Sequence, residues 1–319
     1  MTATCAPAHE IDYQAVVHLA SRIFGDRRVE VQRSSEGVST YVYRVHHDES
    51  TWYIRVLPED GASFAPEVAA HQRLSALGVK VPKVIYFDNR DEALRRSVMV
   101  TSAVEGGPVL PTTAEGSARQ VFIEAGRDLA ILNSVPVEGF GWVRRDHGDV
   151  ALLTGEHATH GALLLEHWRD DIEYLEEHVF NQRLIVRLAD IVAELSEVSQ
   201  ADRATLAHGD FDTTHIFQMD DHYTGIIDFG EIRGTGPWYD PGHFHLHDGE
   251  RLRFRALAPL LQGYGEVSPL PEDVISHVRL SALLIGVRAL VRNLRKRPPG
   301  AYTTYLAKRI EVDVASFSE

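Results

Sequence analysis

Two short segments in the second half of the chain constrain its chemistry more than any other feature. The first is His-Gly-Asp-Phe-Asp-Thr-Thr-His-Ile at residues 208–216, and the second is Ile-Asp-Phe-Gly at residues 227–230. This layout is typical of phosphoryl-transfer sites, in which one Asp accepts a proton from an incoming hydroxyl, a metal ligand follows five residues later, and another Asp holds Mg²⁺. Asp210, His215 and Asp228 stand in that order. The simpler alternative is a pair of unrelated turns rich in Asp and Gly.

The residue types suit that chemistry to different degrees. Asp228 follows the apolar run 225–227, which we interpret as a buried strand that ends at the phosphates. Mg²⁺ prefers oxygen ligands, so a carboxylate is expected at this position. Imidazole is a poorer ligand for Mg²⁺ than an amide oxygen, so His215 binds the metal less well than the usual ligand, or Asp212 or a water molecule serves in its place.

The two segments resemble the Brenner-type motif of the aminoglycoside phosphotransferase family, small-molecule kinases related to the protein kinases. Residues 208–210 and 227–230 carry the resemblance, and Asp240 resembles an Asp that commonly follows. The family usually has Asn where this chain has His215. The resemblance implies an α+β fold that is bilobal and protein-kinase-like. Residues 1–105 would form a nucleotide-binding lobe around an antiparallel sheet, and residues 106–319 a mainly helical lobe for catalysis and substrate binding.

The N-terminal part fits this expectation. Alternating apolar residues predict strands at 29–32, 40–46 and 51–57. The short polar connection 33–39, which includes Gly37 and Ser39, can fold over phosphates and offer them backbone N–H groups and hydroxyls. It lacks a three-glycine pattern, so the alternative is an ordinary hairpin.

Further nucleotide-binding residues are implied by the resemblance. Arg55, on the third strand, resembles the basic residue that kinases place there, and Glu67, on the helix expected at 66–77, is its expected ion-pair partner. Each has a plainer interpretation, as a solvated strand charge and as a first-turn helix charge favoured by the helix dipole. The strand and turn at 97–106 are implied to bind adenine through backbone groups of Thr101, Ser102 and Ala103.

The second lobe is expected to be mostly helical, with helices at 117–132, 161–180, 184–197 and 272–297. Acidic residues gather on the second of these helices and would bind amino groups if it borders the acceptor, although a solvated helix face is the simpler interpretation. The alternating His243, His245 and His247 suggest a zinc site, but no Cys or His-Glu-x-x-His pattern supports one. No Gly-x-Ser-x-Gly elbow supports a Ser hydrolase.

Composition limits the classes of partner. The formal net charge of −14 argues against nonspecific nucleic-acid binding and suits a cationic substrate. With the single Cys5 no intramolecular disulfide is expected, and residues 1–10 do not have the pattern of a signal peptide. The apolar segment 280–294 contains Arg288 and Arg292, and its uncharged run is shorter than the roughly 20 residues that cross a bilayer. We therefore expect a cytoplasmic protein, monomeric or homodimeric, without a membrane partner.

Together these observations predict a small-molecule O-phosphotransferase that uses ATP or GTP with Mg²⁺. Asp210 is the expected catalytic residue and Asp228, with His215, the expected metal site. The acceptor is predicted to be a hydroxylated compound with cationic character, such as an aminoglycoside-like antibiotic. The alternatives are a kinase of a metabolite sugar or amino alcohol and a nucleotide-binding pseudokinase.

Overall fold

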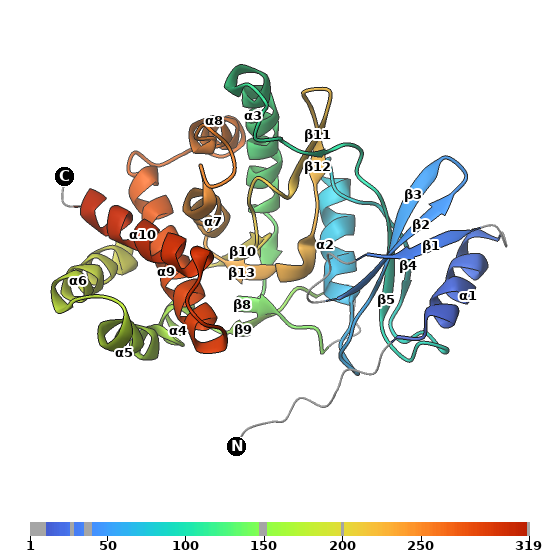
Figure 1. Ribbon diagram of the computed structural model, residues 1–319, viewed down its shortest axis with the longest axis horizontal. Coiled ribbons are helices and arrows are strands. Elements are labelled where there is room, and N and C mark those ends of the chain that lie inside the picture. Colours follow the sequence, from blue (N-terminus) through green and yellow to red (C-terminus); the bar gives the residue numbers. More distant parts are fainter. Residues whose placement is uncertain (1–10, 26–28, 35–39, 147–151, 199–200, 318–319) are drawn as a thin grey trace. The chain divides into compact units, whose positions relative to one another are not determined.

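The computed structural model describes residues 11–25, 29–34, 40–146, 152–198 and 201–317, and the chain divides into two compact units. The first unit comprises Met1–Glu105, Arg144–Leu153 and Gly225–Gly230. The second comprises Gly106–Val143, Thr154–Thr224 and Glu231–Glu319. The elements of both units are labelled along the chain in Figure 1.

The first unit is an antiparallel sheet with a helix on each face. The strands are ordered β1-β2-β3-β5-β4, and the elements are α1 (Tyr13–Phe24), β1 (Glu30–Arg33), β2 (Tyr41–His47), β3 (Ser50–Val56), α2 (Ala65–Ala76), β4 (Val84–Asp88) and β5 (Val98–Ser102). Side chains alternate across a strand, so Val98 and Val100 pack with α1 on one face, while Met99 packs with Val68 of α2 on the other. The strands predicted at 29–57 form within two residues of their expected bounds.

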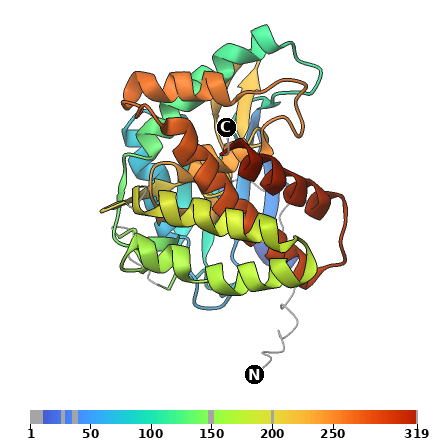
Figure 2. The ribbon, with the colours of Figure 1, turned by 90° about the vertical axis from the view of Figure 1, so that its left-hand side faces the viewer.

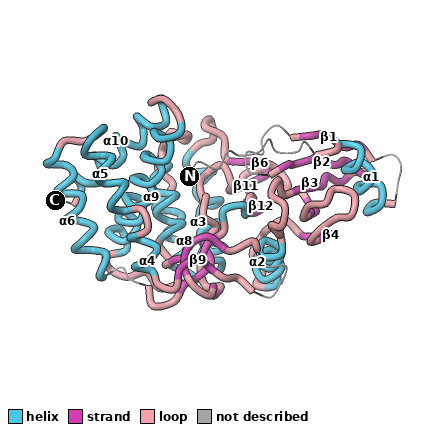
Figure 3. Tube along the Cα trace, turned by 90° about the horizontal axis from the view of Figure 1, so that it is seen from below, coloured by secondary structure: helices cyan, strands magenta, loops and turns pink. Residues whose placement is uncertain are grey.

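The second unit is mostly helical, as the cyan tube in Figure 3 shows. Five short strands are ordered β7-β10-β13-β8-β9, and β12-β11-β6 form a smaller sheet. The strands are β6 (Gly107–Pro108), β7 (Pro136–Val137), β8 (Phe140–Val143), β9 (Gly155–His157), β10 (Ala204–Ala207), β11 (Ile216–Met219), β12 (His222–Ile226) and β13 (Arg233–Thr235). The helices are α3 (Glu115–Leu132), α4 (His160–Leu165), α5 (Trp168–His178), α6 (Gln182–Val198), α7 (Tyr239–His247), α8 (Leu257–Val267), α9 (Val274–Lys296) and α10 (Ala301–Ser316), with a 3₁₀ turn η1 at Phe229–Glu231.

The single helix predicted at 161–180 is wrong, because the chain forms α4 and α5 instead. His167 has φ −123° and ψ −6°, which are not helical values, and it separates the two helices. Thr159 begins α4 by accepting a hydrogen bond from the N–H of Ala162. Asp171 is buried in α5 and paired with Arg288 of α9, so tertiary contact fixes α5 in its own direction.

Helix α9 forms the centre of the helical core. It packs against α5, α6, α7 and α10, and Figure 2 shows α5, α6, α9 and α10 lying across one another. Its buried face includes Val278, Leu283, Val287 and Leu290. The helix is long and apolar enough to cross a membrane, but a buried core helix of a globular unit meets the same criterion, and here 44% of the window is buried.

Helices α3 and α8 approach closely because each has a glycine at the contact. A Cβ added to Gly263 would lie 1.8 Å from the carbonyl oxygen of Ile123, and one added to Gly126 would lie 2.0 Å from that of Leu260. Real Cβ atoms do not approach backbone oxygens so closely. The short distance between the two helices therefore depends on glycine, which has no Cβ atom, at both positions.

Gly263→Ala should lower the free energy of unfolding by roughly 2–3 kcal/mol, because the two backbones must move apart. Gly116→Ala is the matched control, since Gly116 lies in α3 with open space around its Cβ position. The control should be neutral or stabilise by about 0.5 kcal/mol through helix propensity. Urea denaturation measures both, and equal midpoints for the two variants would contradict the packing argument.

Candidate active site

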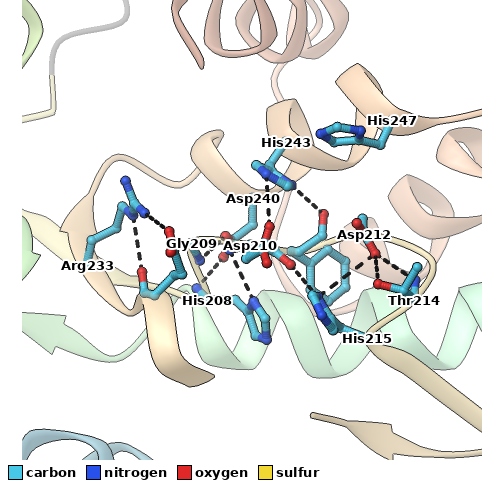
Figure 4. Close-up of polar contacts among 12 residues, drawn as sticks. His208, Gly209, Asp210, Asp212, Thr214, His215, Arg233, Asp240, His243 and His247 are labelled. Atoms are coloured by element: carbon cyan, nitrogen blue, oxygen red, sulfur yellow. Dashed lines mark hydrogen bonds and ion pairs between the residues drawn. The ribbon is translucent and has the colours of Figure 1, made fainter. Parts of the chain in front are cut away.

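The segment 208–216 is a loop between β10 and β11 that one buried carboxylate holds in place. Asp240, at the start of α7, is fully buried. Its oxygens accept hydrogen bonds from the backbone N–H of His208 at 2.8 Å and from that of Gly209 at 2.9 Å (Figure 4). They also accept one from Nδ2 of Asn133 at 2.9 Å. Hydrogen bonds to an ionised acceptor are stronger than neutral ones. Asp240 therefore fixes the backbone that leads into Asp210.

Gly209 is required by the shape of this loop. Its φ is +89°, which L side chains rarely adopt, and a Cβ would lie 1.9 Å from the carbonyl oxygen of Glu231. The chain thus turns sharply between the buried His208 and the partly exposed Asp210. This turn delivers the Asp210 side chain to a cavity.

Asp210 borders a cavity of about 520 Å³ within the second unit, and its side chain is 43% exposed. The polar and charged side chains around it include those of Asp212, Glu231, Arg233, Tyr239, His243, His247, Glu250, Arg251, Arg288, Arg292 and Tyr302. The volume suits a small molecule and the lining offers many polar groups.

His243 of α7 faces Asp210 from the cavity side. Its Nε2 lies 3.3 Å from Oδ1 of Asp210, and its Nδ1 lies 3.1 Å from the carbonyl oxygen of Phe211 (Figure 4). Burial, helped by His247, lowers the pKa of His243 to about 4, although Asp210 and the Phe211 carbonyl act in the opposite direction. At neutral pH the ring is therefore uncharged. The neutral ring has a single N–H, which it can donate from Nδ1 to the Phe211 carbonyl or from Nε2 to Asp210.

Asp210, Asp212 and His215 form a cluster whose potential metal-ligand atoms lie within 4.8 Å of one another. Oδ1 of Asp212 accepts hydrogen bonds from the N–H of Thr214 at 2.6 Å and from its hydroxyl at 2.5 Å. Burial alone would raise the pKa of Asp212, but His215 and the two Thr214 hydrogen bonds outweigh it and lower that pKa. Asp212 is therefore ionised at neutral pH.

The two carboxylates fit a hard divalent cation better than His215 does. Mg²⁺ takes oxygen ligands, and a carboxylate with a lowered pKa presents them without losing a proton. His215 uses Nδ1 in a 2.6 Å contact with the carbonyl oxygen of Asp210, which leaves Nε2 as its remaining ligand atom. His215 therefore stabilises the loop through the contact of its Nδ1 with the carbonyl oxygen of Asp210. This role does not depend on whether His215 also binds a metal.

In the first unit, Glu67 connects two arginines. It is fully buried in α2, accepts from Nη1 of Arg55 at 2.7 Å and also pairs with Arg145. Arg145 donates in addition to the carbonyl oxygen of Gly230 at 2.8 Å. The expected pairing of Arg55 with Glu67 is present, and Arg145 is an added partner that the sequence pattern did not indicate.

Asp228 follows β12 in the turn that precedes η1. Its φ is +65°, a left-handed conformation that is uncommon for a residue other than Gly, and its side chain is 54% exposed. Oδ1 of Asp228 lies 3.9 Å from Nη2 of Arg55. Such backbone strain is common where a side chain has to be aimed at a ligand. Arg55, Glu67 and Asp228 thus lie together in the first unit.

The other residues predicted to contact the nucleotide lie in the connector at 101–103 and in the connection at 33–39. Thr101 is buried in β5, and the N–H groups of Ser102 and Ala103 already donate to the carbonyls of Lys83 at 2.9 Å and Thr51 at 3.0 Å. A purine in this connector would have to use other backbone groups. Gly37 and Ser39 lie outside the described residues.

Two contributors to the loop were missed in the sequence. His243 appeared only as one of three alternating histidines, yet each makes a different polar contact: His245 lies 3.2 Å from Asp313, and His247 lies 2.9 Å from Glu250. A helix at 239–247 would have indicated that His243 and His245 point in different directions. Asn133, at the end of α3, donates to Asp240, a contact between residues too far apart in the sequence for a local pattern to indicate.

Asp240→Asn should destabilise the second unit by about 3 kcal/mol, because a single amide oxygen cannot satisfy three buried donors. Asp202→Asn is the matched control, since Asp202 is exposed just before β10. Urea denaturation followed by tryptophan fluorescence distinguishes the two. If both variants unfold at the wild-type midpoint, Asp240 does not hold the loop.

Comparison with known proteins identifies the family and the fold of the chain. The model of the phosphotransferase enzyme family matches residues 30–274. Among solved structures, the chain is similar to a thermostable mutant of aminoglycoside phosphotransferase APH(4)-Ia in a ternary complex with ADP and hygromycin B, with 16% identity, a TM-score of 0.69, and coverage of 96% of this chain and 99% of that one. No curated protein matches the chain.

Two further structures share the fold. One is the GDP and kanamycin complex of APH(2")-IIIa, with 19% identity, a TM-score of 0.61 and coverage of 95% and 98%. The other is a fructosamine-3-kinase candidate from Thermobifida fusca YX-ER1, with 18% identity, a TM-score of 0.61 and coverage of 94% and 99%. The expected kinase-like bilobal fold is confirmed, with an N-terminal antiparallel sheet followed by a mostly helical part. The family model matches residues 30–274, which make up most of the chain, so the chain belongs to the phosphotransferase enzyme family.

Proposed function

We propose that this protein transfers the γ-phosphoryl group of ATP or GTP to a hydroxyl of a small molecule, in a reaction that requires Mg²⁺. The observation that carries the proposal is Asp210, a partly exposed carboxylate that a rigid loop presents to a cavity, in a member of a phosphotransferase family. Related structures hold ADP or GDP, which supports a purine nucleotide as the donor.

Each polar group of the site has a role in this reaction. Asp210 orients the acceptor hydroxyl and takes its proton. Arg55, held by Glu67, binds phosphate oxygens. In the first unit Asp228 would hold Mg²⁺, which would shield the phosphate charge when bound, and in the second unit Asp212 and His215 are candidate ligands for a divalent cation. Catalysis then rests mainly on positioning and charge neutralisation, because the nucleotide supplies its own leaving group.

The cavity lining bears on the acceptor. An aminoglycoside-like cation was the acceptor first favoured by the sequence, and the related structures include hygromycin B and kanamycin complexes. Yet the cavity beside Asp210 has four arginines around it, Arg233, Arg251, Arg288 and Arg292, against four acidic residues. This balance does not favour a compound that carries several positive charges.

Asp210→Asn should lower turnover by roughly 10²–10⁴-fold, because the amide cannot accept the hydroxyl proton, while nucleotide affinity stays within about twofold. Asp170→Asn, at an exposed position of α5, is the matched control. Release of ADP or GDP over a panel of sugars, amino alcohols and antibiotics measures turnover, and calorimetry measures nucleotide affinity. Full turnover in Asp210→Asn would remove the residue from the base role. Wild-type protein that binds nucleotide without transfer to any acceptor would identify a pseudokinase.

Glu67→Gln should raise the Michaelis constant for the nucleotide roughly tenfold, because two arginines lose their buried anionic partner and Arg55 is no longer held. Glu59→Gln, at an exposed position after β3, is the control. Nucleotide titration of initial rates, with a melting curve for each variant, separates lost affinity from lost folding. An unchanged Michaelis constant in folded Glu67→Gln would contradict the role of Arg55.

A further inference from the structure

A second cavity, of about 250 Å³, adjoins the first within the second unit. The two cavities share five lining residues, Arg233, Tyr239, Ile285, Arg288 and Arg292. A molecule with its hydroxyl at Asp210 can therefore extend into the second cavity without leaving the protein surface. We call the second cavity the tryptophan pocket.

The tryptophan pocket is apolar and aromatic. Its walls come from Trp142 of β8, Trp168 of α5 and Trp238 before α7, with leucines of α4 and α9 between them. Aromatic and branched aliphatic side chains bind flat or branched apolar groups by removing them from water. A sugar can stack one C–H face on such a ring, but its hydroxyls gain nothing from the leucines, so a fully apolar ring system suits the whole wall better.

Arg233 stands at the junction of the two cavities and is already neutralised. Its guanidinium lies over the rings of Trp142 at 4.1 Å and Tyr239 at 4.8 Å, and it pairs with Glu231 at 3.0 Å. Cation–π contacts hold a guanidinium in one orientation. Arg233 thus forms part of the wall and is not available as a binding group for the ligand.

Acidic residues of both cavities have partners as well. Asp171 pairs with Arg288 at 3.0 Å, Glu250 with His247 at 2.9 Å and Glu166 with His157 at 3.2 Å. Among the described residues, the acids that line the two cavities outside the cluster of Asp210, Asp212 and His215 are therefore paired.

Two arginines of the cavity lining differ from these paired residues. Within the described part of the chain, Arg251 and Arg292 make no hydrogen bond or ion pair, and Arg292 borders both cavities. A guanidinium with all its donors available binds a carboxylate or phosphate by two parallel hydrogen bonds. The electrostatics therefore favour an anionic group on the ligand, near the place where the cavities meet.

We propose that the acceptor of this enzyme is an amphipathic hydroxylated anion, with an apolar ring system in the tryptophan pocket and an acidic group on Arg292. The inference rests on the proposed phosphotransferase function and specifies its substrate class. The hydroxyl lies at Asp210, the anionic group at the junction and the ring system beyond it.

Three probes test the proposal on the full chain. 4-(Hydroxymethyl)-2-naphthoate carries the hydroxyl and the anion on one ring with the second ring beyond them, 1,3-bis(hydroxymethyl)naphthalene has a second hydroxymethyl group in place of the anion, and kanamycin is a polycation without an apolar face. Calorimetry should show that the naphthoate binds about fivefold or more tightly than the diol, and about tenfold more tightly than kanamycin. Tighter binding of kanamycin than of the naphthoate would overturn the proposal.

Variants on α9 locate the two contacts. Arg292→Gln should abolish the preference for the naphthoate over the diol, whereas Lys296→Gln, exposed on the same helix, should keep it. Leu284→Trp should fill the tryptophan pocket and weaken both naphthalene compounds by about tenfold, whereas Ile275→Trp, which is exposed, should not. Leu163→Trp serves in place of Leu284→Trp if the latter melts early. A preference that survives Arg292→Gln, or binding that survives both pocket-filling variants, overturns the proposal.

Phosphate transfer is read separately, as ADP release from MgATP with each probe. Transfer to kanamycin but not to the naphthoate overturns the acceptor class and leaves the proposed function standing. The expected binding pattern without transfer to any compound, here or in the wider panel, overturns the proposed function and with it the assignment of the pocket to an acceptor.

Discussion

The buried carboxylate of Asp240 is the constraint on which the site depends. It gathers two backbone donors from the start of the loop and one amide from the end of α3, so three segments distant in the sequence are joined at one anion. A loop with polar backbone groups buried this deeply is stable only if those groups are bonded. Gly209 completes the arrangement, since its left-handed backbone lets the chain turn against Glu231. The rest of the loop, from Asp210 to His215, owes its position to this anchor.

The first unit has a comparable device in Glu67. A single buried acid there orders two guanidiniums, one from β3 and one from the segment after β8, and the second guanidinium also holds Gly230 beside Asp228. Removing one partner of such a cluster leaves a charge without compensation in a place where water is scarce. The cluster therefore ties the phosphate-binding group predicted on β3 to the turn that carries the predicted metal ligand.

The fold and the order of the site could be predicted well, because both depend on local patterns. Alternation placed three strands of the first sheet, and the spacing of the two Asp-containing segments indicated the family. The features that could not be predicted from the sequence depend on tertiary contacts. The break between α4 and α5 falls at His167, and the partners Arg145 and His243 lie far along the chain from the residues that they contact. No local periodicity encodes such pairs.

Asp240 and Asp210 lie close to the same loop, but the structure gives them different roles. Asp240 is fully buried, and its oxygens accept three hydrogen bonds from the loop and from Asn133, so its side chain is committed to holding the loop. Asp210 is 43% exposed, and its carboxylate lies 3.3 Å from Nε2 of His243 and close to Asp212 and His215. Because it borders the cavity, this carboxylate is open to an incoming hydroxyl. The same residue type thus serves as a brace when its acceptors are filled and is suited to act as a base when they are not.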